Sequence, residues 1–143
     1  MIGVNCVIGG NVKIGKNVTI GNNVEIRDNV TIGDNCVIDS MSCLTGDTCI
    51  GNNVVIRMAV FIGKNVLIGD NVFISPRATI LNQDHQRKRA EMTRIGRGAF
   101  IGASAIVAGG VEIGENVVIG ALSFANKSCA DGVWAGVPIR RKS

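Results

Sequence analysis

One short stretch of the chain holds the side chains best suited to acid–base chemistry. It reads LNQDHQRKRAEMTR over residues 81–94 and contains His85, the only histidine in the sequence. A neutral imidazole accepts protons near pH 7, so His85 is a candidate general base. Asn82, Asp84 and Arg87 lie close to it in the sequence. A lone loop histidine is otherwise ordinary solvated surface, so its surroundings must decide between the two interpretations.

A second group of candidate side chains lies near the end of the sequence. Lys127, Arg140 and Arg141 are basic, and the two arginines follow the turn residues Gly136 and Pro138. Basic side chains bind phosphate groups through charge-assisted hydrogen bonds. Without further context, such a run is typical of a solvated surface or a non-specific anion patch.

A six-residue repeat runs through most of the chain and must position both groups. An isoleucine, leucine or valine recurs at every sixth position from residue 2 to 80, and the register resumes from 95 to 119. The residue after this repeat position is usually glycine, and the residue three positions after the repeat position is usually Asn or Asp. The residue two positions earlier is small or branched, as at Val12, Val18, Val24, Val30, Cys36, Val54, Val60, Val66, Val72 and Ala78.

Strand geometry converts this repeat into a fold. Side chains alternate along a strand, so residues two positions apart both point inward. Asn accepts the left-handed backbone angles of a tight corner. Three strands and three corners then close a coil of about eighteen residues, and the coils stack as a solenoid. The sequence therefore predicts an all-β, parallel β-helix of hexapeptide repeats, a single domain over 1–143 with an inserted loop at about 81–94.

The repeat and the C-terminal motifs resemble those of the hexapeptide-repeat acyltransferases. The segment IGASAIVAGGVEIGENVVIGALSFANK, residues 101–127, is similar to the family's acetyl-CoA-binding coils, and WAGVPIRRK, residues 134–142, is similar to its closing motif. The resemblance covers residues 2–140. It implies left-handed coils, acetyl-CoA as co-substrate, and a homotrimer with active sites between subunits. Met58 and Leu122 depart from the family's pattern.

The resemblance also implies roles for the candidate residues. His85 is expected to be the general base that deprotonates the acceptor. The residues expected to bind the acceptor are Asn82, Asp84 and Arg87. The residues expected to bind acetyl-CoA are Ala103, Gly120, Ala121, Lys127, Arg140 and Arg141, with the three basic side chains on its phosphates.

Within the family, the motifs are closest to those of sugar O-acetyltransferases, such as the galactoside, maltose, nodulation and surface-polysaccharide enzymes. The Asp84–His85 pair looks more like that of the O-acetyltransferases of surface-polysaccharide synthesis. We therefore predict an acetyltransferase that acts on a hydroxyl of a sugar or polysaccharide precursor. An N-acetyltransferase for a nucleotide-linked amino sugar is the alternative enzyme, since such enzymes have a similar size and scaffold. A structural β-helix is the non-enzyme alternative, but it would need neither the loop with His85 nor the basic tail.

The outward position before each repeat residue changes character along the chain. It is polar at Lys13, Thr19, Glu25 and Thr31, and then apolar at Val37, Cys43, Cys49, Val55, Phe61, Leu67 and Phe73. A long exposed apolar run favours a subunit interface. At the corners, Asp39 and Arg57 are expected to stack one coil apart as a structural ion pair.

Composition argues against several other classes. Five cysteines without a CxxC pair are expected to be small apolar filler, and one histidine is too few for a three-histidine zinc site, so no metal is expected. The few aromatic residues are not interleaved with basic ones, as nucleic-acid binding would require. The sequence shows no membrane-spanning apolar run and no signal-peptide profile. We therefore expect a cytoplasmic protein with a small-molecule or saccharide acceptor.

Overall fold

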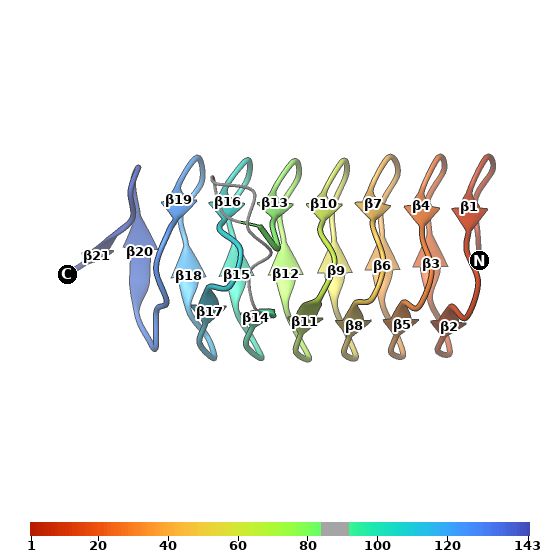
Figure 1. The fold of residues 1–143 in the computed structure, drawn as a ribbon, viewed down its shortest axis with the longest axis horizontal. Coiled ribbons are helices and arrows are strands. Elements are labelled where there is room, and N and C mark those ends of the chain that lie inside the picture. Colours follow the sequence, from red (N-terminus) through yellow and green to blue (C-terminus); the bar gives the residue numbers. More distant parts are fainter. Residues whose placement is uncertain (84–91) are drawn as a thin grey trace.

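The computed structural model describes residues 1–83 and 92–143 and shows a solenoid of coils stacked along one axis (Figure 1). Every regular element in these two ranges is a strand. The strands form three sheets that run along the sides of the solenoid, and all pairings are parallel except that of the last two strands. The predicted all-β fold, a left-handed parallel β-helix, is confirmed.

Each sheet takes every third strand of the chain. The seven-stranded sheet contains β1 (Val7–Ile8), β4 (Glu25–Ile26), β7 (Cys43–Leu44), β10 (Phe61–Ile62), β13 (Thr79–Ile80), β16 (Ile106–Val107) and β19 (Phe124–Ala125). The six-stranded sheet contains β2 (Lys13–Ile14), β5 (Thr31–Ile32), β8 (Cys49–Ile50), β11 (Val66–Ile68), β14 (Thr93–Ile95) and β17 (Glu112–Ile113). The eight-stranded sheet contains β3 (Thr19–Ile20), β6 (Val37–Ile38), β9 (Val55–Ile56), β12 (Phe73–Ile74), β15 (Phe100–Ile101), β18 (Val118–Ile119), β20 (Val133–Ala135) and β21 (Arg140–Lys142).

Three columns of corners connect the sheets, and we name them by what they carry. The loop edge joins the seven- to the six-stranded sheet through corners 9–11, 27–29, 45–47, 63–65, 81–83 and 108–110. The asparagine edge joins the six- to the eight-stranded sheet through corners 15–17, 33–35, 51–53, 69–71, 96–98 and 114–116. The alanine edge joins the eight- to the seven-stranded sheet through corners 21–23, 39–41, 57–59, 75–77, 102–104 and 120–122.

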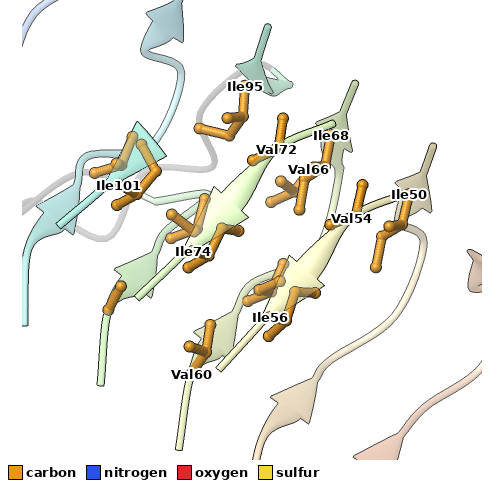
Figure 2. Close-up of a cluster of buried hydrophobic side chains, with 14 of the residues drawn as sticks. Ile50, Val54, Ile56, Val60, Val66, Ile68, Val72, Ile74, Ile95 and Ile101 are labelled. Carbon is orange, nitrogen blue, oxygen red and sulfur yellow. The ribbon is translucent and has the colours of Figure 1, made fainter. Parts of the chain in front are cut away.

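The interior is a continuous column of isoleucine and valine. Figure 2 shows these side chains from neighbouring coils meeting inside the solenoid. Every repeat position from Ile20 to Ile119 is buried, because the register places it directly on its counterpart in the next coil, as Ile38 on Ile56. The sixfold repeat therefore specifies the core, as predicted.

The corners explain the Asn and Gly of the repeat. The third corner residue has a positive φ at every one of these corners except 81–83, as in Asn35 with φ 58°, where Asn costs less than most residues. On the asparagine edge, the side-chain oxygen of Asn52 accepts the N–H of Asp34 at 2.8 Å, one coil earlier. A Cβ on Gly33 would collide with that same oxygen. These close contacts fix the stacking of one coil on the next.

The inserted segment is shorter than the predicted range of 81–94. Leu67 pairs with Arg94, 27 residues later, whereas Cys49 pairs with Leu67, 18 residues later, so nine extra residues enter this coil. Leu81 stays in register through its N–H, which bonds the carbonyl of Val107 at 2.9 Å. Thr93 already belongs to β14. The prediction was too wide at both ends because the pattern alone did not show that these flanking residues still pair.

The apolar run that begins at Val37 does not form one flank, which corrects the sequence-based interpretation. Steps of six residues visit the three sheets in turn, so the run winds around the solenoid. The outer face of the eight-stranded sheet begins with the polar Thr19 and is consistently apolar from β6 to β20, namely at Val37, Val55, Phe73, Phe100, Val118 and Val133. The six-stranded sheet is more polar, with Lys13, Thr31, Cys49, Leu67, Arg94 and Glu112 outward. On the apolar face, the rings of Phe73 and Phe100 stack with centroids 5.4 Å apart.

Candidate functional site

The loop edge carries the two ends of the inserted segment. Asn82 and Gln83 precede it and Thr93 follows it. Thr93 is fully buried, and its hydroxyl donates to the carbonyl of Leu81 at 2.7 Å while accepting the N–H of Gly110 at 2.9 Å. One side chain thus ties both ends of the segment to the next coil.

The predicted general base and two of its neighbours, His85, Asp84 and Arg87, lie outside the described residues. Asn82, the remaining predicted acceptor ligand, is half-buried on the loop edge and stacks over Gly63. The segment that contains His85 is therefore rooted on this edge, beside Asn82.

A hollow of about 370 Å³ lies on the loop edge, toward the N-terminus from Asn82. We call it the loop-edge hollow; its lining includes Val7, Glu25, Arg27, Asp28, Asn29, Thr45, Gly46, Asp47 and Lys64. Arg27 Nε lies 2.7 Å from Glu25 Oε1. That hydrogen-bonded guanidinium lowers the pKa of the Glu25 carboxyl below its ordinary value. The lining thus combines carboxylates, cations and backbone groups.

The alanine edge brings together three of the predicted cofactor-binding residues. Ala103 and Ala121 are exposed and occupy the same corner position one coil apart, and the N–H of Leu122 bonds the carbonyl of Ala103 at 2.9 Å. Gly120 lies beside them, where an added Cβ would come 2.9 Å from that of Ala135. Leu122 is 73% exposed and points away from the solenoid. The C-terminal end of this edge, at Ala103, Gly120 and Ala121, therefore presents a strip of backbone and small side chains beside the projecting Leu122.

The basic tail folds back as β21, antiparallel to β20. Arg140 lies opposite Ala135, so it extends the strip of small residues on the alanine edge. Arg141 instead pairs with Asp131 at 2.8 Å. Lys127 lies over the ring of Trp134, 5.6 Å from its centroid. Of the predicted phosphate ligands, the structure thus brings Arg140 to the strip and places the other two elsewhere at the same end.

A second hollow, of about 430 Å³, adjoins Ala103 on the alanine edge. Asp39, Arg57, Met58, Pro76 and Arg77 contribute to its lining. Arg57 Nη1 lies 3.3 Å from Asp39 Oδ2, which confirms the predicted pairing one coil apart.

Two buried hydroxyl residues, Thr93 and Ser123, support these regions, and neither was assigned a structural role from the sequence. Thr93 is described above, and Ser123 accepts the N–H of Gly136 at 3.0 Å, which fixes the turn before β21. Both occupy inward positions where most repeats have valine. A polar residue at an inward repeat position was therefore the available signal.

Two of the five cysteines, Cys36 and Cys129, are buried. Burial raises the pKa of the Cys36 and Cys129 thiols, which makes them poor nucleophiles and fits their expected role as apolar filler. Within 1–83 and 92–143, no three His, Cys, Asp or Glu side chains are grouped so that they could hold a metal ion. No helix of membrane-spanning length and apolarity occurs in these ranges.

Solved structures of sugar acyltransferases share this architecture. A variant of AntD, an N-acyltransferase from Bacillus cereus, in complex with dTDP and coenzyme A, has a TM-score of 0.80 at 26% identity and covers 95% of this chain and 86% of that one. A variant of perosamine N-acetyltransferase from Caulobacter crescentus, with CoA and GDP-perosamine, has a TM-score of 0.67 at 18% identity, with coverage of 96% and 57%. The acetyltransferase domain of PglB from Neisseria gonorrhoeae, with acetyl coenzyme A, has a TM-score of 0.70 at 20% identity, with coverage of 90% and 54%.

The chain spans little more than half the length of the last two proteins, and at their level of identity they show the fold alone. Comparison with the curated proteins finds no significant match. The model of the bacterial transferase hexapeptide (six repeats) matches residues 1–28, 14–46, 47–82 and 92–124. These matches cover most of the sequence, so the chain belongs to the bacterial transferase hexapeptide family.

Proposed function

We propose that the chain is an N-acetyltransferase that transfers the acetyl group of acetyl-CoA to the amine of a nucleotide-linked amino sugar. The observation that carries the proposal is the likeness to AntD, an N-acyltransferase whose complexes contain coenzyme A with dTDP or with dTDP-4-amino-4,6-dideoxyglucose. This acceptor is the alternative in the sequence analysis, and the comparisons favour it over a sugar hydroxyl. Acyl transfer to a sugar precursor is common to both.

The alanine edge fits the donor. Pantetheine is a narrow chain with two amides, and the strip of Ala103, Gly120 and Ala121 offers backbone groups without bulky side chains. Coils are about 4.8 Å apart, so an extended cofactor would run over several of them along the axis. Arg140 at the end of the strip supplies a cation for the phosphates, and Lys127 and Arg141 add positive charge at the same end.

The chemistry requires one proton to leave the acceptor nitrogen and one proton to reach the coenzyme A sulfur. The acceptor nitrogen attacks the thioester carbonyl and forms a carbon–nitrogen bond, while His85, as neutral imidazole, takes a proton from that nitrogen. The tetrahedral oxyanion needs an N–H donor, as in other acyl transfers. Collapse of the intermediate breaks the carbon–sulfur bond, and the coenzyme A thiolate leaves and takes up a proton. Asn82, Asp84 and Arg87 are proposed to hold the acceptor near His85.

Assembly completes the proposed site. The loop edge, which roots the His85 segment, and the alanine edge lie on opposite sides of the seven-stranded sheet. Within one subunit, the width of that sheet separates the ends of the His85 segment, at Gln83 and Met92, from the proposed donor strip. We propose a homotrimer in which the loop edge of one subunit meets the alanine edge of the next, with the apolar face of the eight-stranded sheet buried in the assembly.

The proposal is tested by following release of the coenzyme A thiol from acetyl-CoA with matched acceptors. We expect turnover with nucleotide-linked 4-amino or 3-amino sugars and none with the corresponding hydroxy sugars. Turnover of the hydroxy sugars at an equal or greater kcat/KM would overturn N-acetylation in favour of O-acetylation. If acetyl-CoA neither supports turnover with any acceptor nor raises Tm, acetyl transfer itself is wrong.

A further inference from the structure

The loop-edge hollow continues the same column of corners that carries Asn82. Going toward the N-terminus, the middle corner residues of this column are Asn82, Lys64, Gly46 and Asp28. Successive coils are about 4.8 Å apart, so Lys64 lies one coil from Asn82, Gly46 about 10 Å away and Asp28 about 14 Å away. A ligand extending from Asn82 along this edge therefore meets these residues in a fixed order.

The first part of the hollow is rich in hydrogen-bond donors. At several corners a middle N–H is capped by a side-chain oxygen one coil later, as Gly10 N–H is by Asp28 Oδ1 at 2.8 Å. The same cap is missing for the N–H groups of Asp28 and Gly46, which have no acceptor among the described residues. The reason lies in the sequence, since residue 46 has no side chain and the ammonium of Lys64 only donates.

Gly46 also creates the space. It has φ 125°, and a Cβ at this position would lie 3.0 Å from the carbonyl oxygen of Asp28 and 3.9 Å from Cε of Lys64. The Lys64 side chain thus passes over a floor made of backbone. Adjacent backbone N–H groups beside an ammonium are a common arrangement for binding phosphate oxygens.

The far part of the hollow has the opposite character. Asp47 Oδ1 accepts the side-chain amide of Asn29 at 3.0 Å, and Asp28 Oδ1 is bound to Gly10, so each carboxylate retains a second oxygen beyond these contacts. Carboxylates that face a ligand typically accept hydrogen bonds from ribose hydroxyls. Val7, which is 62% exposed, closes this end with an apolar surface.

We propose that the loop-edge hollow binds the nucleoside diphosphate part of the acceptor. Lys64 and the Gly46 N–H contact the diphosphate, Asp28 and Asp47 accept the ribose hydroxyls, and the base packs on Val7. The order sugar, diphosphate, ribose and base then matches the order Asn82, Lys64, Asp47 and Val7 along the edge. This inference rests on the proposed function, because it assumes that the acceptor's sugar lies beside Asn82.

Binding of free nucleotides to the full chain tests the inference without any acetyl transfer. Isothermal titration calorimetry with UDP, dTDP and GDP measures Kd for the wild type and for two variants. Lys64→Ala should raise Kd for the preferred nucleotide about tenfold or more, because one charge-assisted phosphate contact is lost. Asp47→Asn should raise Kd for the diphosphate and for its nucleoside by a similar factor, since it removes one charged acceptor for ribose.

Matched controls come from the asparagine edge. Lys16→Ala removes a lysine from the same corner position as Lys64, and Asp70→Asn makes the same Asp-to-Asn change as Asp47→Asn. Neither control should change Kd for the nucleotide. Asn already occupies the column of Asp47 at Asn29 and Asn65, both with positive φ, so Asp47→Asn is compatible with the fold. A wild type that binds none of the three nucleotides, or equal losses in Lys16→Ala and Lys64→Ala, would overturn the inference.

The two proposals fail in different ways. If the enzyme acetylates free amino sugars and binds no nucleotide, the inference is wrong and N-acetylation stands. If nucleotide binding depends on Lys64 while acetyl-CoA does not bind, the inference stands and the proposed donor is wrong. If Lys64→Ala raises KM for acetyl-CoA and leaves nucleotide Kd unchanged, the hollow belongs to the donor and the inference is wrong.

Discussion

At the scale of single residues, the structure separates side chains that carry chemistry from those that hold them in place. Thr93 has no proposed contact with a ligand, yet its hydroxyl joins the carbonyl before the inserted segment to an N–H in the next coil. Both hydrogen bonds are partly buried, although Gly110 itself is exposed. Loss of the hydroxyl would remove both bonds and leave the half-buried carbonyl of Leu81 without this partner, which costs more than the bond itself contributes.

Thr93→Val is therefore expected to lower the free energy of unfolding by about 1–3 kcal/mol, measured by urea denaturation. We also expect a lower kcat, because the roots of the His85 segment are loosened. Thr31→Val, at an exposed outward position on the six-stranded sheet, is the matched control and should change stability by less than about 0.5 kcal/mol. Equal effects of the two substitutions would contradict the role assigned to Thr93.

His85→Ala is expected to lower kcat by about 10²–10⁴-fold with little change in KM for acetyl-CoA, the usual contribution of a general base. In the wild type, kcat/KM should fall toward acid pH, because a protonated imidazole cannot accept the acceptor's proton. The variant should keep only the part of this dependence that comes from protonation of the acceptor amine itself. A variant with wild-type kcat would remove His85 from the mechanism.

At the scale of elements, the three edges and three outer faces are chemically distinct although they share one repeat. The asparagine edge keeps its polar ladder, whereas on the alanine edge Met41, Ala59 and Arg77 adopt positive φ values of 58–64°. Side chains other than Asn and Gly cost about 1 kcal/mol or more in this conformation. Departures from the repeat that carry such a cost suggest a role other than folding. They coincide with the edge proposed to bind the donor.

The eight-stranded sheet provides the test of assembly. Phe73→Glu places a charge in the middle of its apolar outer face, beside Phe100. If that face is buried between subunits, the mass in solution should fall about threefold, from trimer to monomer, by size-exclusion chromatography with light scattering. Thr31→Glu on the polar six-stranded sheet should leave the mass unchanged. A wild type that is monomeric at micromolar concentration would contradict the proposed trimer.

At the scale of the whole molecule, the two ends of the solenoid differ. In the first coil the inward residues Ile2 and Ile8 are 49% and 38% exposed, whereas Ile38 is completely buried. At the other end, Trp134 and Ile139 pack against the core, and β21 covers β20. Because each coil is stabilised by its neighbours, the coil with fewest contacts opens most easily.

We therefore expect amide hydrogen exchange in residues 1–14 to be about tenfold or more faster than in residues 54–80, measured by mass spectrometry in the folded chain. Residues 117–139 should exchange at rates close to those of the middle coils, because the C-terminal end is covered. Uniform exchange along the chain would mean that the solenoid opens as one unit.

Much of the fold could be predicted from the sequence, because a repeat with unbroken register leaves few alternatives. The positions of Ile20 through Ile119 in the core followed from the period of six alone. The grouping of outward residues into faces did not follow from that period. Residues about eighteen apart share a sheet, whereas residues six apart lie on different sheets. Gly46 was missed for another reason: only the stacked coils show that its missing side chain leaves space beside the carbonyl of Asp28 and the side chain of Lys64. The choice between amine and hydroxyl acceptors depends on the comparisons, because both fit a loop histidine.

The constant coil spacing has a consequence for how such proteins measure their ligands. Equivalent positions along an edge are separated by a whole number of coils. Adding eighteen residues on the N-terminal side of the His85 segment would therefore lengthen the proposed acceptor-binding surface by one coil. The proposed donor-binding strip would not change. An insertion such as the nine residues found here adds no coil, because the strands on either side of it still pair in register. Chain length in this fold can therefore be tuned to the length of a substrate separately from the chemistry at its reactive end.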